Sequence, residues 1–438
     1  MVKYNAEGDL LFSASKDHII NLWHSHNGER LGTYEGHNGT VWTIDADFWG
    51  IMREAAEEEL DHPDETTTCE ALDRAAKQAV PSHRGMNPAG AGDQRSSQSR
   101  GISLGMSLLR GRGGMARARR MEGGTGIRRS GWWWFDSAHV DCVHSCSPTL
   151  HNYLLPTSTY LISGSADNNL KLWDVRTGTC LYTWEFPTAV KRVMWSEDDS
   201  KILAVTEQRM GFKGAVRVFE INRDDPTKQS VEPLFQIEST GSKATVAAWC
   251  ALDQYIVTGH ENGYLNLWDM DGELFYEKED RAHNDLITDL QMAPDGTYFI
   301  TSSKDKSAKI WSIGPDKNSH GDEDYLTLIK TFTGEPPLNS AAILPGKPYA
   351  LLGGGQEAMA VTTTGARHGH FEVRFWHLVF EEEVARVKGG FGPCNTIAVH
   401  PQTKGYAIGG EDGYVRVHHF DDDFFAAKPY GASLEPED

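Results

Sequence analysis

The sequence predicts an all-β protein, specifically a seven-bladed WD-repeat β-propeller, and three observations lead to this prediction. A turn residue followed six positions later by an aromatic residue recurs along the chain. Short segments of alternating apolar and polar residues, four to a repeat, surround each copy. Most copies recur after about 40 to 45 residues, the period of a propeller blade. The intact copies are Asp17 to Trp23, Asp167 to Trp173 and Asp305 to Trp311, and the altered copies are Asn262 to Trp268 and Asp412 to His418.

Length and charge limit the possible functions. The length of 438 residues would by itself suggest two or three domains, but repeated units pool their apolar surfaces into one body. Lys and Arg total 42 against 62 Asp and Glu, which gives a formal net charge of -20. This balance argues against binding of the whole protein to a phosphate backbone, and we expect no direct sequence-specific nucleic-acid binding.

Cysteine usage and hydropathy predict the compartment. The six Cys residues are scattered without an even framework of spacings, so we expect no disulfide scaffold. The first residues lack the apolar core of a signal peptide, and no apolar run approaches about 18 residues. These features predict a soluble cytoplasmic protein that does not associate with membranes.

The first repeat runs from Val2 to about Leu31, with a final strand that reaches Tyr34. Its four strands are expected at residues 2–5, 10–13, 19–23 and 30–34. In the fifth repeat His283 stands 22 residues before Asp305, whereas the equivalent position in the first repeat would fall before Met1. We therefore expect that a segment which usually precedes Val2 is missing.

A long insert interrupts the second repeat between its first two strands. The repeat opens with Gly36-His37 and a strand at 40–44, but its second strand begins only near Tyr160. The stretch between them is first acidic, then rich in Gly, Arg and Ser, and it holds no sustained periodicity, which predicts disorder. The predicted organisation is 1–47 for blade 1 and the start of blade 2, 48–157 for the insert, 158–425 for the rest of the propeller, and 426–438 for an acidic tail.

From Leu161 onward the repeats continue to the end of the propeller. The interval from Trp311 to Trp376 is 65 residues, and we ascribe its extra length to an enlarged loop of the sixth unit, including Gly353–Thr364. Counting the third strands gives seven blades. Their marker residues are Trp23, Trp173, Phe219, Trp268, Trp311, Trp376 and His418.

Polar residues at fixed offsets predict a buried hydrogen-bond network within the blades. A His, a Ser or Thr, the turn Asp and the third-strand Trp can form one chain of hydrogen bonds, because a buried Asp needs donors. Ser13 and Thr258 have the hydroxyl offset in two further blades. Since an active site occurs once, repeated copies predict a scaffold without catalytic, cofactor or metal residues. The complete sets are His37, Ser163, Asp167 and Trp173 in blade 2, and His283, Thr301, Asp305 and Trp311 in blade 5.

Two stretches of the insert allow other interpretations. The run Asp141–Cys146, with His139 nearby, has a Cys-x3-Cys spacing that could suggest zinc, but no second Cys pair follows at finger-like spacing. The Gly- and Arg-rich run Arg110–Arg120 could bind RNA. We favour a flexible insert without either function.

Several phrases go beyond general propeller features, and they resemble the WD-repeat i-subunit family of eukaryotic translation initiation factor 3. The resemblance covers residues 2 to about 47 and 158 to about 425, and leaves the insert unmatched. The phrases are Glu7–Phe12, Asn27–Tyr34, Gly164–Asn168, Gly353–Met359, Val361–Thr364, Phe391–Pro393 and Gly409–Arg416.

The resemblance implies a non-catalytic scaffold. Members of this family dock through the b subunit of the factor, with the g subunit alongside, and the factor promotes recruitment of mRNA and initiator tRNA to the 40S ribosomal subunit and scanning. It does not indicate which residues contact a partner, and these remain unknown. The alternative is a WD-repeat adaptor in a signalling or receptor-associated complex. Close relatives of the family resemble such adaptors in sequence.

The sequence departs from the family pattern in four ways. The N-terminal piece that supplies the closing outer strand of the last blade is absent, the insert splits blade 2, Gly390 replaces a His and Ile408 replaces a Ser. We hypothesise that the first two share one cause, a gene model with a lost first exon and a translated intron. The alternative is a lineage-specific loop, which a mature mRNA encoding Glu57 to Arg129 in frame would establish.

Overall fold

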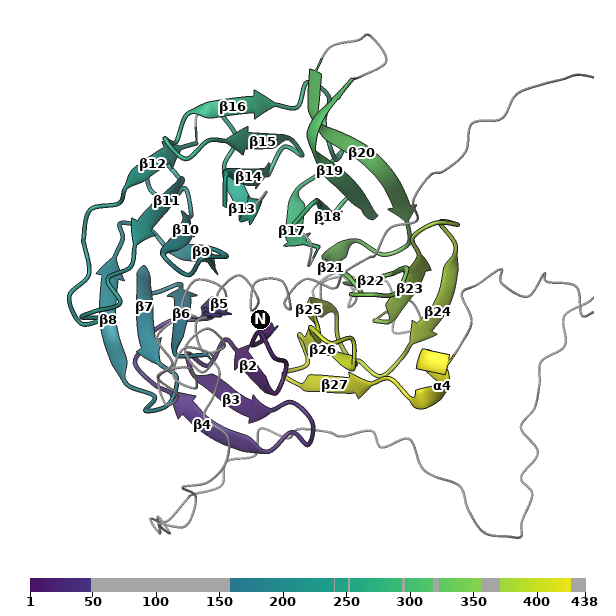
Figure 1. Cartoon of the computed structure of the whole chain (residues 1–438), viewed down its shortest axis with the longest axis horizontal. Helices are drawn as coiled ribbons and strands as arrows, with labels where there is room; N and C mark the ends of the chain where they lie inside the picture. Colours follow the sequence, from purple (N-terminus) through teal and green to yellow (C-terminus); the bar gives the residue numbers. More distant parts are fainter. Residues whose placement is uncertain are drawn as a thin grey trace, which may run out of the picture. The chain divides into compact units, whose positions relative to one another are not determined.

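A computed structural model describes residues 1–48, 158–239, 241–250, 253–293, 296–317, 323–355 and 371–426, which belong to one compact unit. These residues form seven antiparallel sheets that follow one another around a ring, as Figure 1 shows. The predicted seven-bladed all-β propeller is confirmed. All seven predicted marker residues lie on the third strand of their blade.

Six blades have four strands each in the order of the chain, and their bounds are as follows. Blade 1 contains β1 (Val2–Tyr4), β2 (Leu10–Ala14), β3 (Ile20–His24) and β4 (Arg30–Tyr34). Blade 2 contains β5 (Val41–Ala46), β6 (Tyr160–Ser165), β7 (Asn169–Asp174) and β8 (Cys180–Glu185). Blade 3 contains β9 (Val190–Trp195), β10 (Lys201–Thr206), β11 (Ala215–Glu220) and β12 (Phe235–Glu238).

The second half of the ring repeats this plan. Blade 4 contains β13 (Ala244–Cys250), β14 (Tyr255–His260), β15 (Leu265–Trp268) and β16 (Leu274–Glu277). Blade 5 contains β17 (Ile287–Met292), β18 (Tyr298–Ser303), β19 (Ser307–Lys317) and β20 (Glu323–Thr333). Blade 6 contains β21 (Leu338–Ile343), β22 (Tyr349–Gly354), β23 (Val373–His377) and β24 (Glu383–Val387), and blade 7 contains β25 (Cys394–Val399), β26 (Gly405–Gly410) and β27 (Val415–His419).

The core lies between neighbouring blades. Second strands such as β2 are buried along their whole length, because both faces of an inner strand contact a neighbouring sheet. Farther out, an aromatic residue of one outer strand covers the third-strand aromatic of the next blade. Tyr34 lies 5.9 Å from Trp173, and Phe332 lies 5.9 Å from Trp376, measured between ring centroids. Each tilted aromatic pair adds roughly 0.5–1.5 kcal/mol beyond the burial of its area.

The extra length between Trp311 and Trp376 is divided between two blades, which corrects the sequence analysis. Strands β19 and β20 have 11 residues each, so part of the excess extends the outer hairpin of blade 5, seen at the upper edge of Figure 1. The pairing continues from Ser307↔Thr333 to Lys317↔Glu323 through two irregularities. The expected loop of blade 6 falls mainly on residues 356–370, outside the described residues.

Blade 7 has three strands within the described part of the chain, whereas every other blade has four. After β27 the chain forms α4 (Asp422–Ala426), a helix that the sequence analysis does not predict. Phe424 stacks on Phe420 with 4.2 Å between ring centroids and lies 6.1 Å from Tyr349 of blade 6. The helix is therefore anchored on blade 6.

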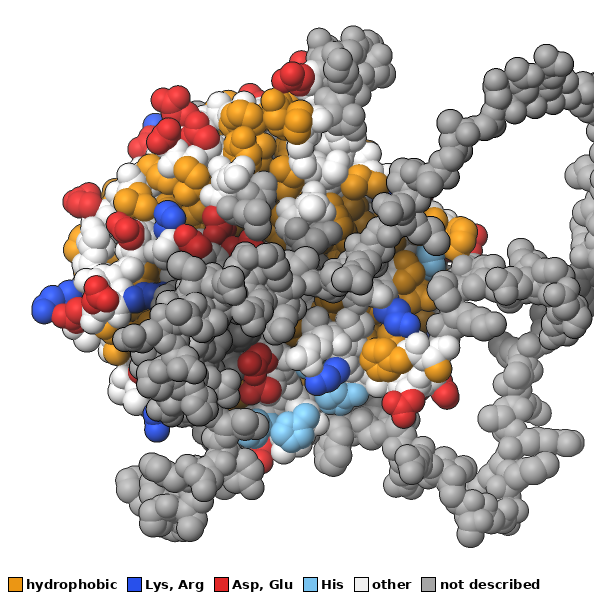
Figure 2. Space-filling view, in the orientation of Figure 1, with side chains coloured by type: hydrophobic (Ala, Val, Ile, Leu, Met, Phe, Trp, Pro, Cys, Tyr) orange, Lys and Arg blue, Asp and Glu red, His pale blue; other side chains and the backbone are white. Residues whose placement is uncertain are grey.

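Apolar residues gather over β16 on the face in Figure 2, where Leu274 and Phe275 are exposed. No helix within the described ranges is long and apolar enough to cross a membrane.

Candidate functional site: the polar networks of the blades

Blade 5 contains one of the two predicted polar networks. His283 Nε2 lies 2.7 Å from the Thr301 hydroxyl, and His283 Nδ1 lies 3.1 Å from the Asp305 carboxylate. The Trp311 indole donates to the same Thr301 oxygen at 3.0 Å. Because the carboxylate can only accept, Nδ1 carries the ring proton and Nε2 accepts the threonine hydroxyl. The structure thus brings all four predicted residues into one chain of donors and acceptors.

Blade 2 builds the same network from residues on both sides of the insert. His37 Nε2 lies 2.7 Å from the Ser163 hydroxyl, and His37 Nδ1 lies 2.9 Å from Asp167. The Trp173 indole donates to Ser163 at 2.8 Å. These three distances agree with the equivalent distances in blade 5 to within about 0.2 Å, so the network has the same geometry in a blade that the insert interrupts.

The networks hold their histidines neutral. Burial lowers the pKa of His37 and His283, and the hydrogen bonds to Asp167 and Asp305 oppose this effect only in part. Burial alone would raise the pKa of Asp305, but hydrogen bonds from His283, Ser307 and the Asn284 amide lower it well below its usual value. A neutral imidazole beside an ionised carboxylate gives every member a partner, which is the arrangement of a structural network.

Blade 4 has a rearranged network that the sequence analysis missed. The Trp268 indole still donates to the Thr258 hydroxyl, at 2.9 Å. The imidazole comes from His260 on β14, whose Nε2 lies 3.0 Å from Thr258 and whose Nδ1 lies 3.1 Å from the Ser242 carbonyl oxygen. The signal available in the sequence was a His two residues after the hydroxyl residue, in a blade where Thr240 stands in place of the usual His.

Blade 7 replaces its histidine by an arginine. Gly390 and Ile408 stand where the sequence analysis expected a His and a Ser, so a weakened network was predicted. In the structure Arg416 Nη1 donates to the Asp412 carboxylate at 3.1 Å, and the Phe391 amide donates to the same group at 3.0 Å. The turn aspartate therefore keeps charged and backbone donors without an imidazole.

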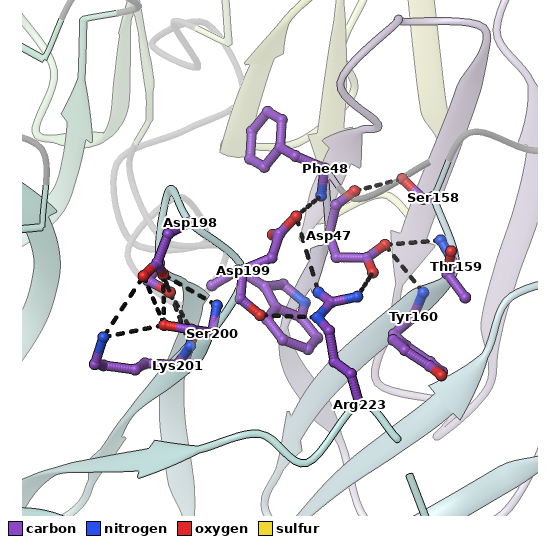
Figure 3. Close-up of polar contacts among 12 residues, drawn as sticks. Asp47, Phe48, Ser158, Thr159, Tyr160, Asp198, Asp199, Ser200, Lys201 and Arg223 are labelled. Carbon is purple, nitrogen blue, oxygen red and sulfur yellow. Dashed lines mark hydrogen bonds and ion pairs between the residues drawn. The ribbon is translucent and has the colours of Figure 1, made fainter. Parts of the chain in front are cut away.

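A buried ionic cluster closes blade 2 where the insert leaves and returns, as Figure 3 shows. The Asp47 side chain is fully buried and accepts the amides of Thr159 and Tyr160 at 2.8 and 3.0 Å. The Ser158 hydroxyl donates to the Asp47 carbonyl at 2.7 Å. Arg223 of blade 3 donates to the Asp47 carboxylate at 3.1 Å. These bonds hold the two ends of the interrupted hairpin together.

A second carboxylate faces the same arginine. Asp199 accepts the Phe48 amide at 2.8 Å and lies 3.8 Å from Arg223. Burial raises the pKa of Asp199 to about 7, the Asp47 carboxylate acts in the same direction, and Arg223 opposes both. The sequence contained no motif for this cluster, because its members come from turns of two different blades.

The remaining candidates are the metal and RNA interpretations of the insert. Within those ranges no group of three or more His, Cys, Asp or Glu residues is arranged to hold a metal ion. The Gly- and Arg-rich run 110–120 and the Cys and His residues at 139–146 lie outside the described residues. The His, hydroxyl, Asp and Trp residues of the networks recur in blades 2 and 5 and hydrogen-bond to one another.

The fold and the Trp–hydroxyl–His–Asp networks define a WD-repeat β-propeller. A solved structure agrees on the fold alone: the Cps50 (Swd1) β-propeller domain of Myceliophteria thermophila matches with a TM-score of 0.57 and 13% identity, over 96% of this chain and 95% of that chain.

Sequence comparisons give the family. A family model described as EIF3I matches residues 152–429. Eukaryotic translation initiation factor 3 subunit I of Mycosarcoma maydis is 45% identical over 99% of this chain and 94% of its own length. The subunit of Schizosaccharomyces pombe is 40% identical over 98% of this chain and 94% of its own length. The chain belongs to the family of i subunits of eukaryotic translation initiation factor 3.

Proposed function

We propose that this protein is a non-catalytic scaffold subunit of translation initiation factor 3 in the cytoplasm. In that role it supports recruitment of mRNA and initiator tRNA to the 40S ribosomal subunit and scanning. The observation that carries the proposal is the 45% identity with a named i subunit across nearly the whole chain. The adaptor alternative lacks comparable support.

The proposed direct partners are the b and g subunits of the factor. Their assignment rests on the family resemblance, and a propeller suits the role because a rigid ring presents many loops and strand edges to other chains. Contact with the 40S subunit would then pass through the complex. The net charge of -20 favours protein contacts over direct binding to an RNA backbone.

A scaffold role also agrees with the chemistry of the buried polar groups. His37 and His283 are engaged on both ring nitrogens. Their neighbours are structural hydroxyl, indole and carboxylate groups, so neither imidazole is available as a general base for a bound substrate. The absence of catalytic, metal and cofactor residues stays a prediction of the sequence analysis.

The test is affinity recovery of the factor from cytosolic extract with the tagged full-length protein, after nuclease treatment to remove RNA bridges. We expect the b and g subunits in stoichiometric amounts, and circular dichroism must show β structure in the bait. A folded bait that recovers neither subunit contradicts the proposed partners. Recovery of a signalling complex in their place would support the adaptor alternative.

A further inference from the structure

A pocket of about 320 Å³ opens between blades 3 and 4. Its volume is at the lower end of the roughly 300–1,000 Å³ of small-molecule sites. Among the described residues that line it there is no Lys or Arg, although Glu238 and Glu277 contribute two carboxylates. Thr258, His260, Asn266 and Trp268 of blade 4 also line it. The pocket therefore coincides with the rearranged network of blade 4.

The position of Asn266 explains why this space is open. Asn266 stands two residues before the third-strand Trp268, and five of the seven blades carry a long cationic side chain at this position. Blade 1 carries Asn21, so blades 1 and 4 are the two exceptions. The cationic residues are Lys171, Arg217, Lys309, Arg374 and Arg416.

In the other blades, the cationic side chains two residues before the marker residue show which groups this space accepts. We call these side chains the internal cations. Lys309 Nζ donates to the Ala282 carbonyl at 2.6 Å and lies 6.0 Å from the centroid of the Trp311 ring. Arg374 donates to the carbonyl of Glu335 in blade 6. In blade 4 the shorter Asn266 leaves its buried Oδ1 without a hydrogen-bond partner among the described residues. The position that an internal cation fills elsewhere is occupied here by a neutral, shorter group.

The outer strand changes its charge at the same level. Glu277 of β16 is the cross-strand partner of Asn266. The equivalent partners in other blades are neutral or basic: Thr33, Thr183, Gln236, Thr331 and Arg386. Blade 4 thus exchanges an internal cation for an acidic residue directly opposite the vacated position.

We propose that this pocket binds a lysine or arginine side chain presented by a protein partner. The aliphatic stem would lie along Trp268, and the cationic end would meet the Glu277 carboxylate and the carbonyl of Ser239, which corresponds to Ala282 of blade 5 in the strand register. Tryptophan is the most favourable aromatic partner for a cation. A protein is the proposed source because the pocket opens between the outer strands β12 and β16, where a partner backbone can lie along the rim.

Neighbouring groups do not compete for this position. Burial lowers the pKa of His260, so the imidazole in the pocket is neutral at neutral pH. The Lys243 ammonium pairs with Glu261 at 3.1 Å, and the Arg281 guanidinium lies over Tyr264 at 5.7 Å. Neither cation lines the pocket.

The test uses the full-length protein labelled with 5-fluorotryptophan, in which Trp268→Phe assigns the Trp268 resonance. The probes are the capped peptide Gly-Lys-Gly, the same peptide with acetyl-lysine, and n-butylammonium. At equal probe concentrations, we expect a saturable shift of the Trp268 resonance with the lysine peptide and with neither of the other two probes. Glu277→Gln should weaken binding about threefold, as expected for one solvated ion pair. Asn266→Lys should abolish the response, because its own ammonium fills the pocket.

Glu185→Gln is the matched control, since it removes one exposed carboxylate from the outer strand of blade 2. It should bind the lysine peptide like the parent protein. Equal shifts with lysine and acetyl-lysine peptides would overturn the proposed recognition of a cation. Equal weakening by Glu185→Gln and Glu277→Gln would assign the binding to net charge. If n-butylammonium bound as tightly as the peptide, the source would be a free amine and the partner assignment would be wrong. These readouts require no subunit of the factor, so they succeed or fail independently of the proposed function.

Discussion

Blades 5 and 4 are neighbours with the same strand order, but they satisfy their buried polar groups differently. Both keep the bond from the third-strand indole to a second-strand hydroxyl, at 3.0 Å in blade 5 and 2.9 Å in blade 4. Blade 5 then engages His283 and a turn carboxylate, whereas blade 4 engages His260 and a backbone carbonyl. The comparison teaches that a hydroxyl at this position is satisfied in both blades, while the imidazole that satisfies it can come from a different segment of the blade.

The largest expected difference between these blades is in mutational cost. We expect His283→Ala to reduce the free energy of unfolding by about 3 kcal/mol, because it removes the imidazole donor to the Asp305 carboxylate and the imidazole acceptor of the Thr301 hydroxyl. His260→Ala should cost about 1 kcal/mol, since its partner on Nδ1 is a backbone carbonyl without a formal charge. Urea unfolding followed by circular dichroism measures both, with the exposed His26→Ala as control. Equal losses would remove the distinction between the two networks.

The sequence predicted the parts of this comparison that depend on fixed spacing. The offsets among His283, Thr301, Asp305 and Trp311 located one network, and the same offsets survived the insert in blade 2. His260 was missed because the pattern assigned the histidine to a different segment of the blade. The role of Arg416 was missed because the same position carries lysine, arginine or asparagine in other blades, and Lys309 in blade 5 donates to a backbone carbonyl.

Other features depend on pairing between distant segments and therefore escaped the sequence. The excess between Trp311 and Trp376 could not be divided between blades 5 and 6 without the register of β19 and β20. Asp199 and Arg223 contact Asp47 only because blade 3 packs beside blade 2. Periodicity identifies the blades, but contacts between blades need the closed ring.

Acid stability provides a second test, in which the two blades should behave alike. Burial lowers the pKa of both His283 and His260 below the usual histidine value of about 6.5. Below pH 6.5 the unfolded chain therefore binds protons that the folded protein excludes, so stability falls as pH decreases. We therefore expect each histidine to contribute a loss of stability that grows as the pH falls from 7 to 5.5.

The variants His283→Gln and His260→Gln should each remove a similar part of this pH dependence, whatever their effect at pH 7. Urea unfolding at several pH values measures the slope. The lowered pKa of Asp305 adds a further loss of stability only as pH falls below about 4, the ordinary aspartate range. A pH slope that is unchanged in His260→Gln would show that this imidazole is not held neutral.

A smaller effect is expected from making blade 4 resemble blade 5. Asn266→Lys places an ammonium opposite Glu277 and over the Trp268 ring, so we expect the free energy of unfolding to rise by about 0.5 kcal/mol, the scale of a partly exposed ion pair. Thermal unfolding at low and high salt measures the gain, which should diminish at high salt. The double variant with Glu277→Gln is the control and should lose most of it. Destabilisation would contradict the assignment of this space to a cation.

The smallest effect is expected from removing the insert, which compares blade 2 with blade 5. In blade 5 the connection Ala293–Thr297 has five residues, is closed by the Ala293 amide donating to the Tyr298 carbonyl at 2.9 Å, and places Gly296 at φ +66°. The Asp47 amide makes the corresponding bond to the Tyr160 carbonyl at 3.1 Å. Replacing residues 49–158 by Asp-Gly removes Ser158 and its bond to the Asp47 carbonyl together with the insert, and restores a five-residue turn with glycine at the left-handed position.

We expect this shortened protein to unfold within about 0.5 kcal/mol of the full chain, a change typical of a neutral surface alteration. The physical reason is that Asp47 already joins both ends of the hairpin, through the amides of Thr159 and Tyr160 and through Arg223. Asp47→Ala in the shortened protein should cost about 3 kcal/mol, because Arg223 and the two amides lose their shared acceptor. If excision alone caused such a loss, residues 49–158 would contribute to the propeller core, and blade 2 would not be a blade like blade 5 with an independent insertion.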